Sequence, residues 1–85
     1  MTSQPASHPA SQLPTRIAQW IIASYTRHSI TRESLSQQLG VHRNTVIRWE
    51  QGYPIKLADF VALCGKFGEE PGRVLERLVR EAEGR

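Results

Sequence analysis

The stretch ITRESLSQQLGVHRNTVIRWEQG, which spans residues 30–52, decides the fold. Thr31 has a side chain that can accept a hydrogen bond from the first amides of a helix, and Arg32 follows it directly. Gly40 can adopt the left-handed backbone conformation that ends many helices without a steric penalty. These residues predict a helix from Arg32 to Leu39 that ends in a tight turn.

A second helix is predicted directly after that turn. Val46 and Trp49 lie three residues apart, on one face of a helix, and Gly52 follows the last helical position. The pattern predicts a helix from Arg43 to Gln51. The apolar positions suited to burial between the two helices are Leu35, Leu39, Val41, Val46 and Trp49. Two short helices with this spacing are typical of a helix-turn-helix, whose second helix enters the major groove of DNA.

Three further helices are predicted from apolar residues that recur three and four positions apart. The predicted ranges are Thr15–Arg27, Lys56–Phe67 and a last helix from Pro71 to the end. The stripes are Ile17, Trp20, Ile21, Ser24 and Tyr25, then Leu57, Phe60, Val61, Cys64 and Phe67, and finally Val74, Leu75, Leu78, Val79 and Ala82. No stretch alternates apolar and polar residues as a strand does. The sequence therefore predicts an all-α fold of five short helices.

Length and composition divide the chain into a tail and one domain. Its 85 residues are enough for a single domain. Residues 1–14 contain three prolines among small polar residues, with too little apolar surface to offset the entropy of ordering. We interpret residues 1–14 as a disordered tail and residues 15–85 as a helix-turn-helix DNA-binding domain.

The positive charge is concentrated in the segment that contains the helix-turn-helix. The chain has a formal net charge of +3, and residues 15–52 hold five arginines against two glutamates. From residue 53 onward basic and acidic side chains balance, at six each. A localised positive field attracts polyanions, and double-stranded DNA is the partner that we expect.

Other classes of protein are disfavoured by what the sequence lacks. No apolar run is long enough to span a membrane, and the amino terminus does not resemble a secretory signal, so we expect a cytoplasmic protein. Cys64 is the single cysteine, and His8, His28 and His42 lack the spacing of metal ligands. We therefore expect no metal, no cofactor and no enzymatic activity, since no nucleophile or phosphate-binding loop is recognisable either.

The predicted contacts to DNA follow from the donors and acceptors on the second helix of the motif. Arginine pairs with guanine, asparagine pairs with adenine, and methyl groups contact thymine. The predicted base contacts are Arg43, Asn44, Thr45, Ile47 and Arg48. The predicted phosphate contacts are Arg32, His42, Gln51, Tyr53 and Lys56.

At these residues the chain resembles the Xre/Cro-like, or lambda repressor-like, helix-turn-helix family. The matching features are a Thr cap, Leu-Gly-Val, a Thr-Val pair and an aromatic residue followed by Glu, and they lie within residues 30–52. The resemblance implies a five-helix operator-binding domain that is usually homodimeric. His42 stands where the family commonly has Ser or Thr. Tyr25 stands where many members have an arginine that pairs with the residue equivalent to Glu50, so a Tyr25–Glu50 hydrogen bond is expected.

Three functions are compatible with the sequence. The first is a phage, prophage or plasmid repressor that binds an inverted-repeat operator as a homodimer, through the loop after Gly52 and the last helix. In that helix Leu75, Leu78 and Val79 form the expected contact, although the same stripe can instead close the core of the monomer. The second is an antitoxin-type interaction module that holds a protein partner through the last helix or the tail. The third, an excisionase-like protein, requires a β-hairpin wing after the DNA-contacting helix.

Overall fold

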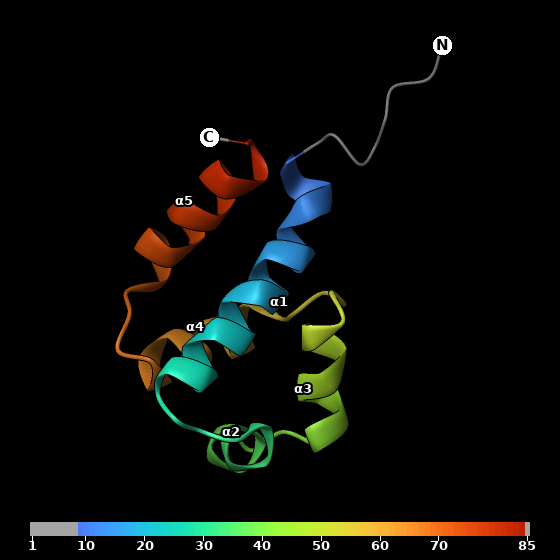
Figure 1. The fold of residues 1–85 in the computed structure, drawn as a ribbon, viewed down its shortest axis with the longest axis vertical. Coiled ribbons are helices and arrows are strands. Elements are labelled where there is room, and N and C mark those ends of the chain that lie inside the picture. Colours follow the sequence, from blue (N-terminus) through green and yellow to red (C-terminus); the bar gives the residue numbers. More distant parts are fainter. Residues whose placement is uncertain (1–8, 85) are drawn as a thin grey trace.

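The computed structural model describes the backbone of residues 9–84 and the side chains of residues 11–84. In this range the chain forms five helices and no strand (Figure 1). They are α1 (Pro9–Arg27), α2 (Arg32–Leu39), α3 (Arg43–Glu50), α4 (Leu57–Lys66) and α5 (Pro71–Ala82). The predicted all-α class is confirmed, and the bounds of α2 are those predicted.

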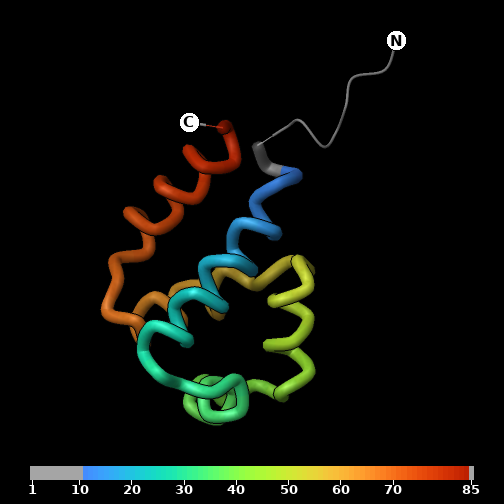
Figure 2. Tube along the Cα trace, in the orientation of Figure 1, coloured from blue at the N-terminus to red at the C-terminus, as the bar shows by residue number. Residues whose placement is uncertain are grey.

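The helices are arranged around α1. It contacts α3 on one side and α5 on the other, while α2 packs against α3 and α4, and α4 packs against α5 (Figure 2). The buried apolar cluster is formed by Ile17, Trp20, Ile21, Leu35, Val46, Trp49, Phe60, Leu63, Cys64, Phe67, Val74 and Leu78. Every helix contributes to this cluster, so a single core holds α2 and α3 in their crossed orientation.

The first four helices end in the same hydrogen-bonded turn. After α2, the Gly40 amide donates to the Gln37 carbonyl at 3.2 Å and the Val41 amide donates to the Ser36 carbonyl at 3.0 Å. This pair of bonds is a Schellman motif, and it requires a left-handed residue. The residues in that position are Ser29 (φ 57°), Gly40 (φ 70°), Gly52 (φ 91°) and Gly68 (φ 68°). Ser29 is the non-glycine residue of the four.

The start predicted for the first helix was wrong. The helix begins at Pro9 and not at Thr15, so residues 9–14 of the predicted disordered tail are helical. Leu13 packs against the core, which offsets the cost of the Pro14 ring inside the helix. Pro9 occupies the first helical position, where a missing amide hydrogen costs no bond. Residues 1–8 of the predicted tail lie outside the described residues.

The apolar stripes of α4 and α5 differ in part from the predicted ones. Leu57 and Val61 on α4 are 73% and 47% exposed, and Leu63 is buried in their place. On α5, Leu78 is only 2% exposed, so it belongs to the core of the monomer and is not free for the predicted dimer contact. Leu75 remains 37% exposed.

Within residues 9–84, none of the helices has both the length and the apolar character of a membrane-spanning segment. The same part of the chain contains no group of three or more His, Cys, Asp or Glu side chains placed to hold a metal ion.

Candidate nucleic-acid interface

The start of α3 is fixed by a histidine cap. The backbone of His42 is extended, and its Nδ1 atom accepts a hydrogen bond from the Asn44 amide at 3.0 Å. Since Nδ1 accepts, the ring hydrogen of the neutral imidazole lies on Nε2. His42 therefore performs the capping function of the Ser or Thr that it replaces, and its exposed ring stays next to the first turn of α3.

One face of α3 is buried and the opposite face is open. Val46 and Trp49 are 0% and 3% exposed, and they anchor the helix in the core. Asn44 and Arg48 lie four residues apart on the open face. That face consists of the exposed Arg43, Asn44, Arg48 and Gln51 with the half-buried Ile47. These residues, which we call the α3 outer face, include four of the five predicted base contacts.

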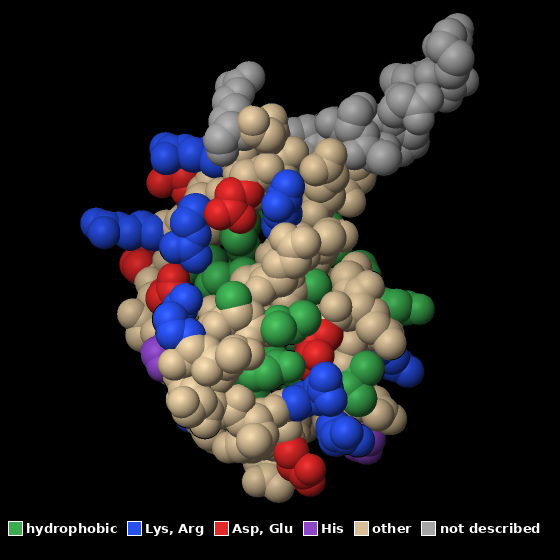
Figure 3. Space-filling model, in the orientation of Figure 1, with side chains coloured by type: hydrophobic (Ala, Val, Ile, Leu, Met, Phe, Trp, Pro, Cys, Tyr) green, Lys and Arg blue, Asp and Glu red, His purple; other side chains and the backbone are tan. Residues whose placement is uncertain are grey.

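Basic side chains on the α3 outer face have no acidic partner. Arg43 and Arg48 form no ion pair with any carboxylate in the described part of the chain. Figure 3 shows basic and acidic side chains side by side both over the α2–α3 pair and over α5. Arg77 and Arg80 of α5 are indeed paired, with Glu69 and Glu76. The positive charge of α3 is thus available to a ligand.

Arg32, one of the predicted phosphate contacts, forms an ion pair with Glu50. Its Nε and Nη2 atoms donate to the two carboxylate oxygens of Glu50 at 2.7 and 2.8 Å, which joins the start of α2 to the end of α3. The Glu50 side chain is only 10% exposed, so the ion pair neutralises a nearly buried charge. The hydrogen bond to Glu50 raises the pKa of Arg32 further above its ordinary value.

Tyr25 borders this ion pair. Burial, and then the charge of Glu50, raise the pKa of the Tyr25 hydroxyl above 10.0. The expected hydrogen bond between Tyr25 and Glu50 also contributes to this rise in pKa. Glu50 has an arginine partner as well, which α2 supplies instead of α1. The sequence correctly predicted that Arg32 begins a helix. It could not identify Glu50 as the partner of Arg32, because that contact depends on how α2 and α3 cross.

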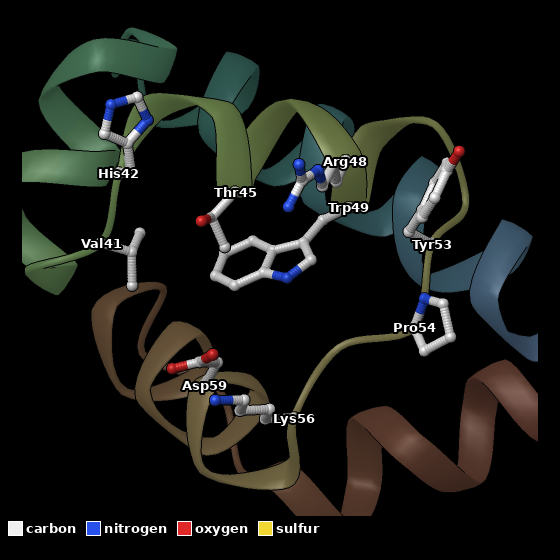
Figure 4. Close-up of a pocket in the computed structure, with 9 residues that line it drawn as sticks. All are labelled: Val41, His42, Thr45, Arg48, Trp49, Tyr53, Pro54, Lys56 and Asp59. Atoms are coloured by element: carbon white, nitrogen blue, oxygen red, sulfur yellow. The ribbon is translucent and has the colours of Figure 1, made fainter.

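A groove of about 570 Å³ lies beside α3, between this helix and the start of α4 (Figure 4). It is lined by Val41, His42, Thr45, Arg48, Trp49, Tyr53, Pro54, Lys56 and Asp59. We call it the α3–α4 groove. It brings together five of the predicted contact residues, namely His42, Thr45, Arg48, Tyr53 and Lys56. Thr45 lies on this side of α3 and not on its outer face.

Four groove residues were not predicted as part of a site, and two of them, Trp49 and Asp59, carry polar groups. Trp49 was assigned to the core, and it is buried, but the edge of its indole reaches the groove. Asp59 lies in the first turn of α4, and acidic residues are common there because they interact favourably with the helix dipole. Its position near the predicted start of this helix was the signal in the sequence that could have drawn attention to it. Both residues depend on the approach of α4 to α3, which periodicity alone does not specify.

The chain was compared by sequence and structure with protein-family models, curated proteins and solved structures. None of these comparisons found a match. The geometry of the α3 outer face and of the α3–α4 groove therefore carries the functional argument.

Proposed function

We propose that this chain is a sequence-specific double-stranded DNA-binding regulator that places α3 in the major groove of its operator. The fold that we propose for it is the lambda repressor-like helix-turn-helix domain, with α2 and α3 as the motif. The observation that carries the proposal is the α3 outer face, which exposes two unpaired arginines beside an asparagine and a glutamine. The acidic residue nearest to it in sequence, Glu50, is neutralised by Arg32.

This face has the chemistry that base edges require. A helix fits the major groove of B-DNA, and its outward residues then meet the edges of the bases. Arg48 can donate two hydrogen bonds to a guanine, and Asn44 can exchange two with an adenine. Ile47, half-buried between them, offers methyl groups to thymine. Each bidentate pair discriminates against a wrong base by about 1–3 kcal/mol.

We further propose that two copies bind the operator as a symmetric dimer, because one domain of this size contacts too few base pairs for genomic specificity. Because Leu78 is buried, we propose that the dimer contact is formed by the loop after Gly52 and by α4. Tyr53, Leu57 and Val61 are 58%, 73% and 47% exposed there. A two-fold axis would place the two α3 helices about 34–36 Å apart, in successive major grooves.

Selection of bound duplexes from random DNA tests the proposal. We expect an inverted repeat whose half-sites are centred about 10 base pairs apart. On that duplex, Arg48→Ala or Asn44→Ala should each cost about 1–3 kcal/mol of binding free energy and relax the preference at one base position. Binding to random duplexes should change much less. Arg73→Ala is the matched control, because Arg73 is exposed on α5 and forms no ion pair within residues 11–84.

Two results would contradict the proposal. The first is equal losses for the Arg48 and Arg73 variants, which would show that only net charge matters. The second is the selection of no preferred duplex, which would leave the antitoxin-type interaction module as the better explanation. An excisionase-like protein is the weaker alternative, since helix α4 and not a β-hairpin follows α3 in the described chain. A saturated operator that holds one protein copy in sedimentation would contradict the dimer.

A further inference from the structure

A second groove lies between α1 and α5, on the side of α1 that faces away from α3 (Figure 1). Its volume is about 230 Å³. It is lined by Arg16, Gln19, Trp20, Ala23, Ser24, Arg27, Arg77, Leu78 and Glu81. We call it the α1–α5 groove. None of these residues belongs to α3 or lines the α3–α4 groove, so a ligand bound here would be separate from the proposed contact with DNA.

The floor of this groove contains a hydroxyl without a hydrogen-bond partner. Trp20, Ser24 and Leu78 are the buried residues that line the groove. Ser24 Oγ is enclosed, and it has no hydrogen-bond partner among residues 11–84. Ser36 is also buried, but its hydroxyl donates to the Glu33 carbonyl at 2.7 Å. Because buried hydroxyls nearly always have a partner, the partner of Ser24 is expected to enter through the groove.

Two arginines at the rim of the groove are only partly satisfied. Arg27 and Arg77 share the carboxylate of Glu69, and each reaches it through a single contact of 3.5 Å. The ion pair of Arg32 with Glu50 is bidentate, at 2.7 and 2.8 Å, and shows how closely a guanidinium can engage a carboxylate in this chain. Both rim arginines are more than half exposed, so N–H donors of each remain for another oxyanion.

The unpartnered hydroxyl and the two arginines lie at the same end of the groove. Arg27 follows Ser24 by three residues, on the same face of α1, and the carboxylate that it shares with Arg77 brings the two guanidinium groups close together. Arg16 lies eight residues before Ser24, about 12 Å away along the helix axis. Glu81 lines the groove one turn after Arg77 and forms no ion pair within residues 11–84. Around Ser24, two positive charges therefore face one shared carboxylate.

We propose that this end of the α1–α5 groove binds the phosphate group of a small molecule. The guanidinium groups of Arg27 and Arg77 donate to two of its oxygens, and the Ser24 hydroxyl donates to a third. Guanidinium groups match phosphate geometry, and three converging donors suit a tetrahedral group better than a carboxylate with two oxygens. The groove is smaller than the roughly 300–1,000 Å³ of pockets for larger ligands, so it accepts little more than the phosphate group itself.

Binding includes a movement of side chains. Ser24 Oγ is enclosed in the free chain, so a phosphate oxygen reaches it only after the atoms that cover it have moved. The exposed arginines of the rim can move at low cost, because each is held by one long contact. The inference does not rest on the proposed function, since it involves no residue of α3.

Charge substitutions of opposite sign test the site, with inorganic phosphate as the probe and sodium chloride of equal ionic strength as the reference. Arg27→Gln and Arg77→Gln should each weaken phosphate binding by the full chain about tenfold. Glu81→Gln should tighten it about twofold, because it removes a negative charge from the groove. Arg73→Gln is the matched control on α5, since Arg73 is exposed and does not line the groove. Equal losses in the Arg73 and Arg77 variants would overturn the inference.

Ser24→Ala separates binding from stability. Removal of the unpartnered hydroxyl should stabilise the free chain, so lost binding in this variant cannot result from unfolding. The same change should weaken phosphate binding about tenfold, since the hydroxyl donates to a charged oxygen. The rise in Tm that phosphate produces in the wild-type chain should accordingly be smaller in Ser24→Ala. A variant that binds phosphate as tightly as the wild type would overturn the inference.

The indole proton of Trp20 reports where the phosphate binds. Trp20 lines the groove and donates to Glu69 Oε2 at 3.4 Å, so a phosphate that draws the two arginines away from Glu69 changes this bond. In NMR spectra of the wild-type chain the Trp20 proton should shift as phosphate is added, and the Trp49 proton should move much less. Trp20→Phe and Trp49→Phe assign the two signals. Shifts confined to Trp49 and to the amides of α3 would overturn the inference.

An excess of short random-sequence duplex distinguishes the two sources of a phosphate group. The duplex alone should leave the Trp20 proton in place, and added phosphate should still shift it. A duplex that shifts the Trp20 proton by itself would identify the DNA backbone as the source and overturn the assignment to a small molecule. A chain that binds no duplex but retains the phosphate-dependent Trp20 shift would contradict the proposed function and support this inference.

Discussion

The turn at the end of α1 predicts that the chain can be stabilised by a single substitution, Ser29→Gly. Ser29 has a φ of 57° and holds the left-handed position of a Schellman motif. The Ser29 amide donates to the Thr26 carbonyl at 3.0 Å, and the Ile30 amide donates to the Tyr25 carbonyl at 2.8 Å. A side chain in this conformation places its Cβ close to the following carbonyl oxygen.

The expected gain is set by two opposing contributions. Release of the left-handed strain should raise the free energy of unfolding by about 1–2 kcal/mol. The greater conformational freedom of glycine in the unfolded chain should lower it by about 0.5–1 kcal/mol. Ser29→Gly should therefore raise the free energy of unfolding by about 0.5–1 kcal/mol. For a domain of this size that corresponds to a rise in Tm of roughly 3–6 °C.

Gly68 provides the matched control. It ends α4 in the same motif, with a φ of 68°, and a Cβ built there would meet no atom within 4 Å. Gly68→Ala should thus lower the free energy of unfolding by about 1 kcal/mol through backbone strain alone. Both variants are measured by urea denaturation and by thermal melting. A Ser29→Gly variant as stable as wild type, beside a Gly68→Ala variant that is not destabilised, would refute the role assigned to these turns.

Substitutions at four other positions test separate features of the core and the site. Ser24→Ala should stabilise the chain by about 1 kcal/mol in urea denaturation, because it removes a buried hydroxyl without a partner. His42→Ala should cost about 0.5–1 kcal/mol in the same assay and His42→Asn should not, since asparagine also caps helices. Leu78→Glu should abolish the cooperative thermal transition, whereas a folded monomer would contradict the core assignment. Burial raises the pKa of the Cys64 thiol to about 11, so from about pH 9 the unfolded chain loses this proton before the folded chain. The free energy of unfolding should fall between about pH 9 and 11, and the fall should be smaller in Cys64→Ala, by an amount on the order of 2 kcal/mol.

Local chemistry explains why the helix-turn-helix segment could be predicted from the sequence. Thr31 and Gly40 fix the two ends of α2 by hydrogen bonds within a few residues, so their effect does not depend on the remaining chain. Spacing alone likewise put Val46 and Trp49 on the buried face of α3 and left Asn44 and Arg48 outside.

Features that depend on packing between distant segments could not be predicted in this way. The helical state of residues 9–14 depends on the packing of Leu13 against the core. The proline content of this segment instead led to the prediction of a disordered tail. The ion pair of Arg32 with Glu50 joins residues that are 18 positions apart. The exposure of Leu57 and the groove position of Asp59 follow from the rotation of α4 about its own axis, which shifts its buried stripe toward Leu63.

The Arg32–Glu50 ion pair has a kinetic consequence for any partner of α3. The pair, at 2.7 Å, fixes the angle between α2 and α3 in the free chain, and the Gly40 turn fixes the connection between them. A partner that docks on α3 consequently meets a surface that is already formed, and ordering the backbone is not part of the binding cost. Association should then be limited by diffusion and electrostatic steering, with a rate constant that falls steeply as salt is added.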